Sequence, residues 1–544
     1  RRLHLRMDGA KLFICRMLPF RFIPLLACLL GALFAAERPN ILFIFSDDHA
    51  RRAISAYGSD LAEIAPTPNI DRLSKEGALF RQSFCANSIC GPVRASVMTG
   101  LHSHKNGLMR NDSGAFDSSQ WNFAKELRSA GYTTAAVGKW HLKSDPTGFD
   151  FWEVYPNQGS YYNPVFRKMD GSRVGEMGYC TDIVIGKATK WLDRRDKDKP
   201  FLLMCQFKAP HRTFCPPLRH LGAFDDVTLP EPPTLFDDYA NRSKTLAENE
   251  MEIDRHMHWQ YDLQVRKDEP GAAGLLPNRF PASEYGRMNE EQKAKWDAYY
   301  GPKNQEFLKK FAAGKLSEKD VVRWKYQRYL KNYLGAVKAV DESVGKLLAY
   351  LDKHNLTDNT VVIYGSDQGF FLGEHGWFDK RWMFEESLEM PFLIRWPGVV
   401  KPGLRPDGMI QNIDYAPTFL EMAGLKPPHK LDGESFVPLL KGETPRDWRE
   451  AIYYAYYELG EHNVPQHYGV RTKRHKLFHL PNHREWQLFD LEKDPHELLD
   501  QSNNPEYAEV RKELEVIYHR LRKQYDAPSY EKYGPGTFKW DPDK

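Results

Sequence analysis

The sequence predicts a mixed α/β fold, in which a sheet is flanked by helices. Compact apolar runs are each followed by polar residues, and between them lie stretches whose apolar residues recur at threes and fours, as in amphipathic helices. The 544 residues are 41% hydrophobic, enough for one large core and a smaller companion. Sheets of this kind bind ligands beyond the carboxyl ends of their strands, so the polar residues after each run are candidates for a site.

The elements are predicted in chain order. Buried strands are expected at 41–45, 133–137, 201–207, 361–364 and 392–394, and helices at 123–130 and 329–352. A further short helix is expected around residues 90–100, because Pro92 suits a first helical turn and Gly100 a helix end. Short runs at 451–457, 469–471, 476–479 and 486–489 predict an antiparallel sheet, followed by a helix over 505–525.

This pattern divides the chain into three parts. Residues 1–36 read as a signal-peptide region, residues 37–442 as the main domain, and residues 443–544 as a carboxyl-terminal subdomain containing the antiparallel sheet. Within the main domain, residues 225–325 are rich in charged and aromatic side chains and show little strand pattern. We expect this insertion to be helical or loop-rich and to shape the rim of the site, with a solvated surface excursion as the alternative.

The amino-terminal region predicts export to a periplasmic or extracellular location. From Met17, a possible true start, a basic segment leads into an apolar run over 22–36, and about fifteen apolar residues are short of the ~20 that span a membrane. We therefore do not expect an integral membrane protein. The segment before Cys28 also resembles a lipoprotein cleavage box, but the apolar run continues past that cysteine.

Charge and cysteine content narrow the function classes. The formal net charge is +3, but residues 1–36 hold a surplus of five positive charges, so the remainder is close to neutral and nucleic acid is not an expected partner. The five cysteines beyond that region are widely spaced and form neither a disulfide framework nor a C-x-x-C zinc pattern.

The most informative segment places a cysteine at the start of the short helix. Arg94 follows Cys90 by four residues and so lies on the same helix face. An anion bound there would meet both the positive end of the helix and a guanidinium group. A buried thiol beside a proline-started helix is the alternative for this pentapeptide alone.

Two strand ends carry acidic residues that indicate a metal site. Asp47 and Asp48 follow the first predicted strand, and Asp367 and Gln368 follow the strand at 361–364. Neighbouring carboxylates converge only around a positive charge, and an oxygen-only ligand set favours calcium over zinc, with magnesium as a second choice. An aspartate pair acting as a helix cap would be the alternative without the second strand end.

A further motif pairs a cation with a titratable ring. Lys139 and His141 follow the predicted strand at 133–137 within a glycine frame, and in an extended segment they project to the same side. A single lysine or histidine in a sequence is more often an ordinary surface or core residue without a functional role.

Together, these segments resemble the type I sulfatases of the alkaline-phosphatase-like superfamily, over roughly residues 38–500. Seven segments in order carry the resemblance: 38–40, 67–73, 90–94, 131–141, 209–211, 366–369 and 373–380. The sequence departs from the usual family pattern at Gly91, Val93 and Gln368, although a glutamine carbonyl can still bind a hard cation.

The resemblance implies an alkaline-phosphatase-like mixed sheet and a sulfuric ester hydrolase. A maturing, formylglycine-generating enzyme would convert Cys90 to 3-oxoalanine (formylglycine), whose hydrate attacks sulfur. The resemblance assigns the metal ligands to Asp47, Asp48, Cys90, Asp367 and Gln368. The resemblance also assigns the nucleophile, sulfate binding and proton transfer to a set of six residues: Cys90, Arg94, Lys139, His141, His211 and Lys380.

The expected substrate is a sulfated saccharide, with 6-O-sulfated N-acetylglucosamine of glycosaminoglycan or mucin glycans as the leading choice. Segments 366–381 and 467–471 look most like bacterial N-acetylglucosamine-6-sulfatases. Substrate contacts are expected from Trp377, Arg381, His462, His467 and Arg471. Iduronate-2-sulfatase, other carbohydrate sulfatase and arylsulfatase activities remain alternatives, as do a phosphate or phosphonate monoester hydrolase and a sugar-binding protein whose cysteine is never oxidised.

Overall fold

The computed structural model describes residues 38–277, 280–458 and 460–529, and the chain from Pro39 onward forms one compact unit. The predicted signal-peptide region and the lipoprotein-like segment lie outside the described residues. No helix among the described residues has the length and apolar character needed to cross a bilayer.

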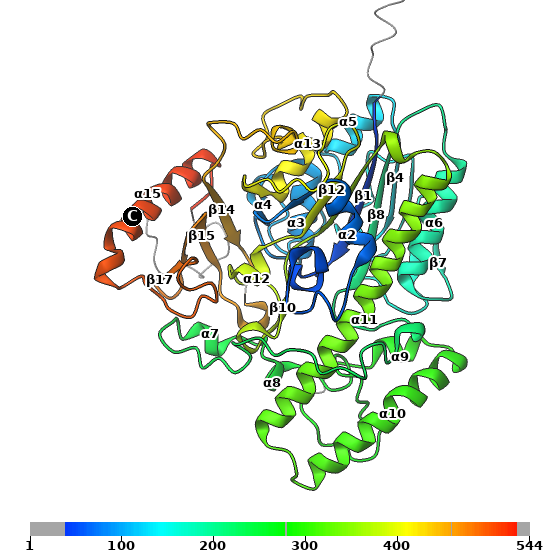
Figure 1. The fold of residues 1–544 in the computed structure, drawn as a ribbon, viewed down its shortest axis with the longest axis vertical. Coiled ribbons are helices and arrows are strands. Elements are labelled where there is room, and N and C mark those ends of the chain that lie inside the picture. Colours follow the sequence, from blue (N-terminus) through cyan, green and yellow to red (C-terminus); the bar gives the residue numbers. More distant parts are fainter. Residues whose placement is uncertain (1–37, 278–279, 459, 530–544) are drawn as a thin grey trace, which may run out of the picture. The chain divides into compact units, whose positions relative to one another are not determined.

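A nine-stranded mixed sheet forms the centre of the molecule (Figure 1). Its strand order is β2-β12-β9-β1-β8-β4-β5-β6-β7. All five predicted strands belong to it: β1 (Asn40–Asp47), β4 (Thr133–Gly138), β8 (Phe201–Pro210), β9 (Thr360–Ser366) and β12 (Phe392–Arg395). Strands β9, β1, β8 and β4 are parallel, whereas β12 runs antiparallel to β9, so the expected mixed α/β class is confirmed.

The remaining strands of this sheet are short and lie outside the five predicted runs. They are β2 (Ala78–Phe80), β5 (Phe151–Val154), β6 (Val165–Lys168) and β7 (Arg173–Gly175). Strand β7 is exposed along its whole length, so it has no apolar pattern to reveal it. Four two-residue strands form two small additional ladders: β10 (Phe371–Leu372) with β11 (Phe378–Asp379), and β13 (Ile410–Gln411) with β3 (Ser83–Phe84).

Helices cover both faces of the central sheet. Alternate residues of β1 therefore pack into two different apolar clusters. Phe43 and Phe45 belong to one cluster and Leu42 and Ile44 to the other. The first face carries α3 (Cys90–Thr99), α5 (Phe123–Ser129) and α13 (Tyr415–Met422), and the second α2 (Pro68–Glu76), α6 (Cys180–Arg194) and α11 (Glu318–Lys353). The described helices also include α4 (Ser103–Asn106), α12 (Glu385–Leu388) and α14 (Val437–Leu440).

The insertion is helical and loop-rich, as predicted. It contains α7 (Thr245–Glu248), α8 (Ile253–His256), α9 (Ser283–Arg287) and α10 (Glu290–Ala312). Helix α11 begins at Glu318 and not near Tyr329, because Ser317 and Asp320 form a capping box that starts the helix earlier. Its first turns pack into the apolar cluster of the insertion.

The carboxyl-terminal part holds the predicted four-stranded antiparallel sheet. Its strands are β14 (Ala451–Tyr456), β15 (His467–Thr472), β16 (His475–Leu480) and β17 (Glu485–Asp490), and α15 (Ala508–Gln524) packs on one face. The five cysteines of the described residues are buried and unpaired, so burial, and not disulfide bonding, accounts for them.

Candidate active site

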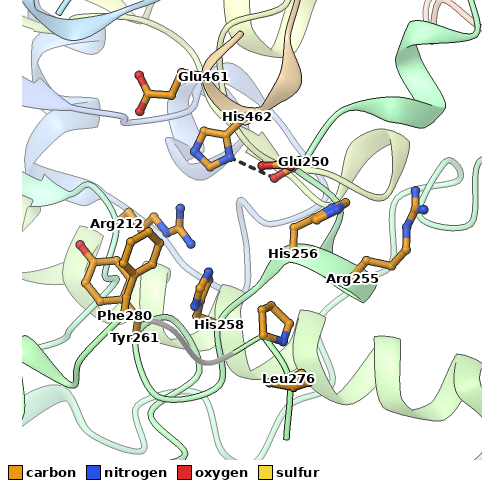
Figure 2. A pocket seen from close by; sticks show the side chains of 11 residues that line it. Arg212, Glu250, Arg255, His256, His258, Tyr261, Leu276, Phe280, Glu461 and His462 are labelled. Atoms are coloured by element: carbon orange, nitrogen blue, oxygen red, sulfur yellow. Dashed lines mark hydrogen bonds between the residues drawn. The ribbon is translucent and has the colours of Figure 1, made fainter. Parts of the chain in front are cut away.

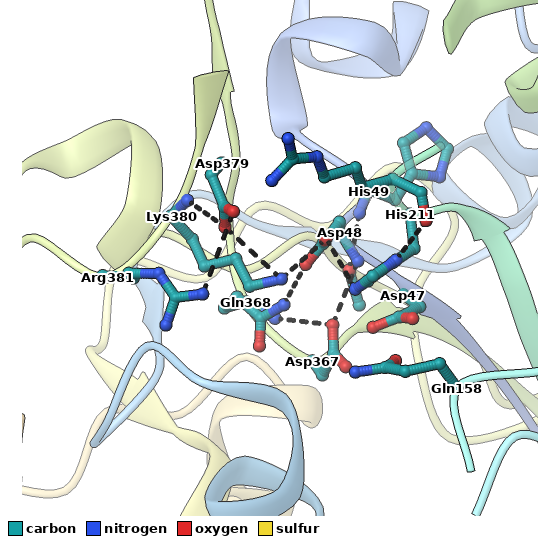
Figure 3. A network of polar contacts seen from close by, with 12 residues as sticks. Asp47, Asp48, His49, Gln158, His211, Asp367, Gln368, Asp379, Lys380 and Arg381 are labelled. Carbon is teal, nitrogen blue, oxygen red and sulfur yellow. Dashed lines mark hydrogen bonds and ion pairs between the residues drawn. The ribbon is translucent and has the colours of Figure 1, made fainter. Parts of the chain in front are cut away.

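Four adjacent parallel strands bring most of the predicted site residues to one edge of the central sheet. Asp47 ends β1 and Asp48 follows it, Asp367 follows β9, His211 follows β8, and Lys139 follows β4. Because the carboxyl ends of parallel strands share an edge, residues far apart in sequence meet there. Figure 3 shows Asp47, Asp48, Asp367 and His211 gathered around one centre.

Three fully buried aspartates form the core of this centre. One oxygen each from Asp47, Asp48 and Asp367 lies within 4.8 Å of the others. Burial and the neighbouring carboxylates raise the pKa of Asp367 to about 8, and burial raises that of Asp48 to about 6. Burial would also raise the pKa of Asp47, but Lys139 and nearby cations hold it well below its usual value. A bound divalent cation would keep all three carboxylates ionised at neutral pH.

The oxygen atoms at this centre fit a hard cation. Asp47 Oδ1 and Gln368 Oε1 are buried and accept no hydrogen bond from any described group. The Gln368 amide nitrogen donates to Asp48 Oδ1, which turns the amide oxygen to the other side. An Asp47 oxygen without a donor, within a cluster of three buried carboxylates, matches the ligand chemistry of calcium or magnesium. The Gln368 oxygen would join this set if the amide oxygen and nitrogen exchanged places.

Cys90 starts α3 and is 1% exposed. Its sulfur lies within 4.8 Å of an oxygen of Asp47 and a ring nitrogen of His211. Arg94, one turn along α3, donates to Asp367 Oδ2 from Nε and Nη2 at 3.2 and 3.0 Å. The expected pairing of thiol and guanidinium on one helix face is therefore present, and the thiol shares the edge that carries the aspartates.

The last residue of β4, directly before Lys139, must be a glycine. Gly138 has φ +99°, and a Cβ there would lie 1.8 Å from the Gln206 carbonyl oxygen, so no side chain fits. Lys139 follows, is fully buried, and donates to Asp47 Oδ2. His141 is half-buried; burial lowers its pKa, with Lys139 acting in the same direction.

His211 and Lys380 approach the cluster from the other side. The His211 ring places Nε2 3.6 Å from Asp48 Oδ2, and its Nδ1 donates to the Arg212 carbonyl oxygen at 2.6 Å. Lys380 Nζ donates to the same Asp48 oxygen at 2.8 Å. Since a carbonyl only accepts, His211 presents Nε2 to the centre.

Next to this centre lies a cavity of about 900 Å³, within the range of small-ligand pockets. Helix α8 and the segments after it, which belong to the insertion, form much of the cavity wall (Figure 2). His462 lines the cavity, and its Nε2 lies 3.4 Å from Asp379 Oδ2. Arg381 Nη2 lies 3.9 Å from that same oxygen and 3.3 Å from Glu461 Oε1.

Three expected substrate contacts do not line this cavity. Trp377 is 0% exposed and donates its indole N–H to the Tyr239 hydroxyl at 2.8 Å. His467 is also 0% exposed and stacks against Trp382. Arg471 is 4% exposed and bonds Glu385. The sequence marked them as aromatic and basic, but all three are used in packing and ion pairing away from the cavity.

Sequence reasoning missed three polar residues of the site. Gln206 on β8 accepts from Arg94 Nη1 at 3.0 Å, Gln158 accepts from Lys139 at 2.5 Å, and Asp379 pairs with Lys380 at 3.6 Å. Asp379 could have been found as the neighbour of a motif lysine. Gln206 and Gln158 stand in no motif that distinguishes them from other glutamines.

Glu458 should make stability depend on pH. It is 2% exposed, accepts from the Asn111 backbone N–H at 2.7 Å, and burial raises its pKa from 4.5 to about 7. Between those values the folded state binds the proton more tightly than the unfolded state, so stability falls as pH rises from 4.5 to 7. The loss reaches up to about 3 kcal/mol at 1.36 kcal/mol per pKa unit.

The variant Glu458→Gln keeps an acceptor for Asn111 without the buried charge. We expect it to melt about 2–3 °C above the parent at pH 8 and together with it near pH 4.5, as measured by calorimetry. Glu443→Gln, at an exposed position, is the matched control. A difference in melting temperature that does not vary with pH would contradict the argument.

Comparisons with known proteins agree with this geometry. Residues 39–425 match the family model described as Sulfatase, and residues 373–524 match the model described as N-sulphoglucosamine sulphohydrolase, C-terminal. The chain is 44% identical over 516 residues to an N-acetylglucosamine-6-O-sulfatase of Bacteroides thetaiotaomicron, covering 94% of this chain and 90% of that protein.

Solved structures give the same picture. A structure in complex with its substrate D-glucosamine-2-N,6-O-disulfate superposes with a TM-score of 0.85 at 44% identity, covering 90% of this chain and 98% of the other. A phosphonate monoester hydrolase of Agrobacterium radiobacter has a TM-score of 0.66 at 22% identity, covering 90% and 96%, which shows a common fold only.

Proposed function

The chain belongs to the sulfatase family, and from that premise we propose that it hydrolyses the 6-O-sulfate ester of glucosamine residues in sulfated saccharides. The observation that carries the reaction class is the meeting of Cys90, Arg94 and three aspartates at one sheet edge. The choice of sugar is supported by the relative that is 44% identical over 94% of this chain.

We propose that Cys90 is carried as formylglycine and that calcium, or less favourably magnesium, occupies the acidic centre. Asp47, Asp48, Asp367 and Gln368 would hold the ion, with the modified Cys90 side chain beside them. When bound, the ion and the formylglycine would supply charge neutralisation and the nucleophile. A maturing enzyme is the required partner, and the basic and apolar segment at 17–36 favours export to the periplasm or beyond.

The protein's own cations would bind the sulfate. Arg94 and Lys139 are each held by a buried aspartate, so their positive charges are fixed before substrate arrives. Preorganised charges of this kind stabilise the transition state without the cost of reorientation. His141, near Lys139, would accept a proton as the product sulfate departs, since burial keeps its ring neutral.

His211 and Lys380 would serve the departing sugar oxygen. The Nδ1–H bond to the Arg212 carbonyl fixes the His211 ring with Nε2 toward the centre, so the imidazolium form, protonated on both nitrogens, would deliver the Nε2 proton. Burial lowers the pKa of His211 and the Asp47 carboxylate opposes that shift. Lys380 Nζ lies beside the same Asp48 oxygen. A well-placed general acid contributes about 10²–10⁴-fold to the rate.

The sugar itself would occupy the neighbouring cavity. Asp379, Arg381 and His462 supply a carboxylate, a guanidinium and a ring nitrogen within reach of one another, a set that suits vicinal hydroxyl groups. Asp379 and Arg381 flank Lys380 in the sequence, and His462 and Arg212 line the cavity, so this set would lie close to the leaving oxygen.

A panel of sulfated sugars tests the proposal. We expect matured protein to release sulfate from 6-O-sulfated glucosamine, N-acetylated or N-sulfated, with kcat/KM at least about 10²-fold above that for 2-, 3- or 4-O-sulfated sugars. Released sulfate is measured by ion chromatography, with 4-nitrophenyl sulfate and phosphate as controls. Release confined to 2-O-sulfated uronides, or faster hydrolysis of the phosphate ester, would overturn the assignment.

A further inference from the structure

The loop between β5 and β6, residues 155–164, contacts two candidate catalytic segments at once. Gln158 Oε1 accepts from Lys139 Nζ at 2.5 Å, and the Tyr161 hydroxyl donates to the His211 carbonyl oxygen at 2.5 Å. Lys139 follows β4 and His211 follows β8, so the loop ties together two strand ends of the site. This loop lies outside the seven motif segments of the sequence.

A buried carboxylate from the insertion fixes the loop. Glu284 on α9 is 6% exposed, and its Oε2 accepts the backbone N–H groups of Tyr161 and Tyr162 at 2.9 and 3.1 Å. The Tyr162 hydroxyl donates to the Pro216 carbonyl oxygen at 2.7 Å. Backbone and side-chain bonds thus fix the loop at the residues that follow Gln158.

Gln158 supplies Lys139 with a neutral acceptor. A lysine ammonium only donates, so the amide oxygen must face it and the amide nitrogen must point the other way. That nitrogen donates to no described residue, and Figure 3 shows the side chain ending beside Asp47 and Asp367. A neutral partner orients the ammonium without cancelling its charge, whereas a second carboxylate would weaken its attraction for an anion.

We propose that Gln158 is a positioning residue for sulfate binding: it holds the Lys139 ammonium between Asp47 and the sulfate, on a loop anchored by Glu284. The proposal rests on the sulfatase function given above. It assigns a role to a residue of the β5–β6 loop and explains why the insertion sends a buried carboxylate toward that loop.

The test compares Gln158→Met, which keeps the length but removes the acceptor, with Gln158→Glu, which keeps an acceptor but adds charge. We expect both variants to bind inorganic sulfate about 10-fold more weakly in calorimetry, and Gln158→Met to lose about 10–100-fold in kcat/KM with an unchanged melting temperature. Asn157→Ala, at an exposed position in the same loop, is the matched control and should behave as the parent.

Unchanged sulfate affinity in both Gln158 variants would overturn the proposal. If Gln158→Met alone loses stability, the folded Gln158→Glu variant still decides the question through its sulfate affinity. Sulfate binding is measured without any sugar, so failure of the parent to hydrolyse 6-O-sulfated sugars would reject the proposed substrate and leave the role of Gln158 to be judged by binding.

Discussion

Cys90→Ala is expected to lose at least about 10⁴-fold in kcat/KM, the scale on which removal of a catalytic nucleophile acts. The Cys90 side chain is buried between Asp47 and His211, and an alanine methyl group there has no atom that can bond to sulfur. Sulfate release from 6-O-sulfated glucosamine measures the effect. Intact mass shows in parallel whether the parent carries the aldehyde, which is lighter than the thiol.

Cys215→Ala is the matched control for this substitution. Cys215 is also buried and unpaired, but it lies in the apolar cluster behind the sheet. We expect it to change stability without a comparable loss of turnover. Parental activity in Cys90→Ala would contradict the assignment of the nucleophile, whatever the substrate.

Removal of divalent ions is expected to lower kcat/KM by about 10³-fold, because a bound ion contributes several kcal/mol of charge stabilisation. It should also lower the melting temperature. Ion at 1,000 times its dissociation constant stabilises the folded state by about 4 kcal/mol, which for a chain of this size corresponds to roughly 4 °C. Dialysis against a chelator, followed by calorimetry and activity measurements with added calcium or magnesium, tests both effects.

Asp47→Asn separates ion binding from general damage. The substitution removes one of the three clustered carboxylates and keeps the shape of the side chain. We expect its melting temperature to respond to calcium only weakly. A parent protein whose melting temperature does not change with calcium or magnesium would reject the metal site even if its activity were unknown.

Much of the fold could be predicted from the sequence, because buried parallel strands appear as short apolar runs with acids or basic motifs directly after them. The apolar runs at 41–45 and 361–364 predict two strands of the central sheet, and the site aspartates follow those runs in the sequence. By contrast, β7 is exposed and β10 and β11 have two residues each, so no local pattern marks them. Helix α11 was predicted too short because its start depends on the capping box at Ser317.

The cavity contacts show the limit of residue type as a guide. Trp377 and His467 are expected from the sequence to contact the sugar, yet both are buried in the aromatic core. Arg381 and His462, which the sequence also predicts as sugar contacts, lie beside Asp379 near the cavity. An aromatic or basic residue has the same local signature in both cases, and only its tertiary neighbours decide whether it lies beside the cavity or in the core.

The sequence by itself indicated the reaction class through seven ordered segments that resemble those of the sulfatases, and each of these segments, like the acids at two strand ends, is a local property of the chain. Tertiary structure alone decided which side chains complete the site. Gln158 accepts a hydrogen bond from Lys139, which lies 19 positions earlier in the chain. Glu284 anchors the loop that carries Gln158 from more than 100 positions away. Hydrogen bonds over such separations depend on how the chain packs, and no sequence period encodes them.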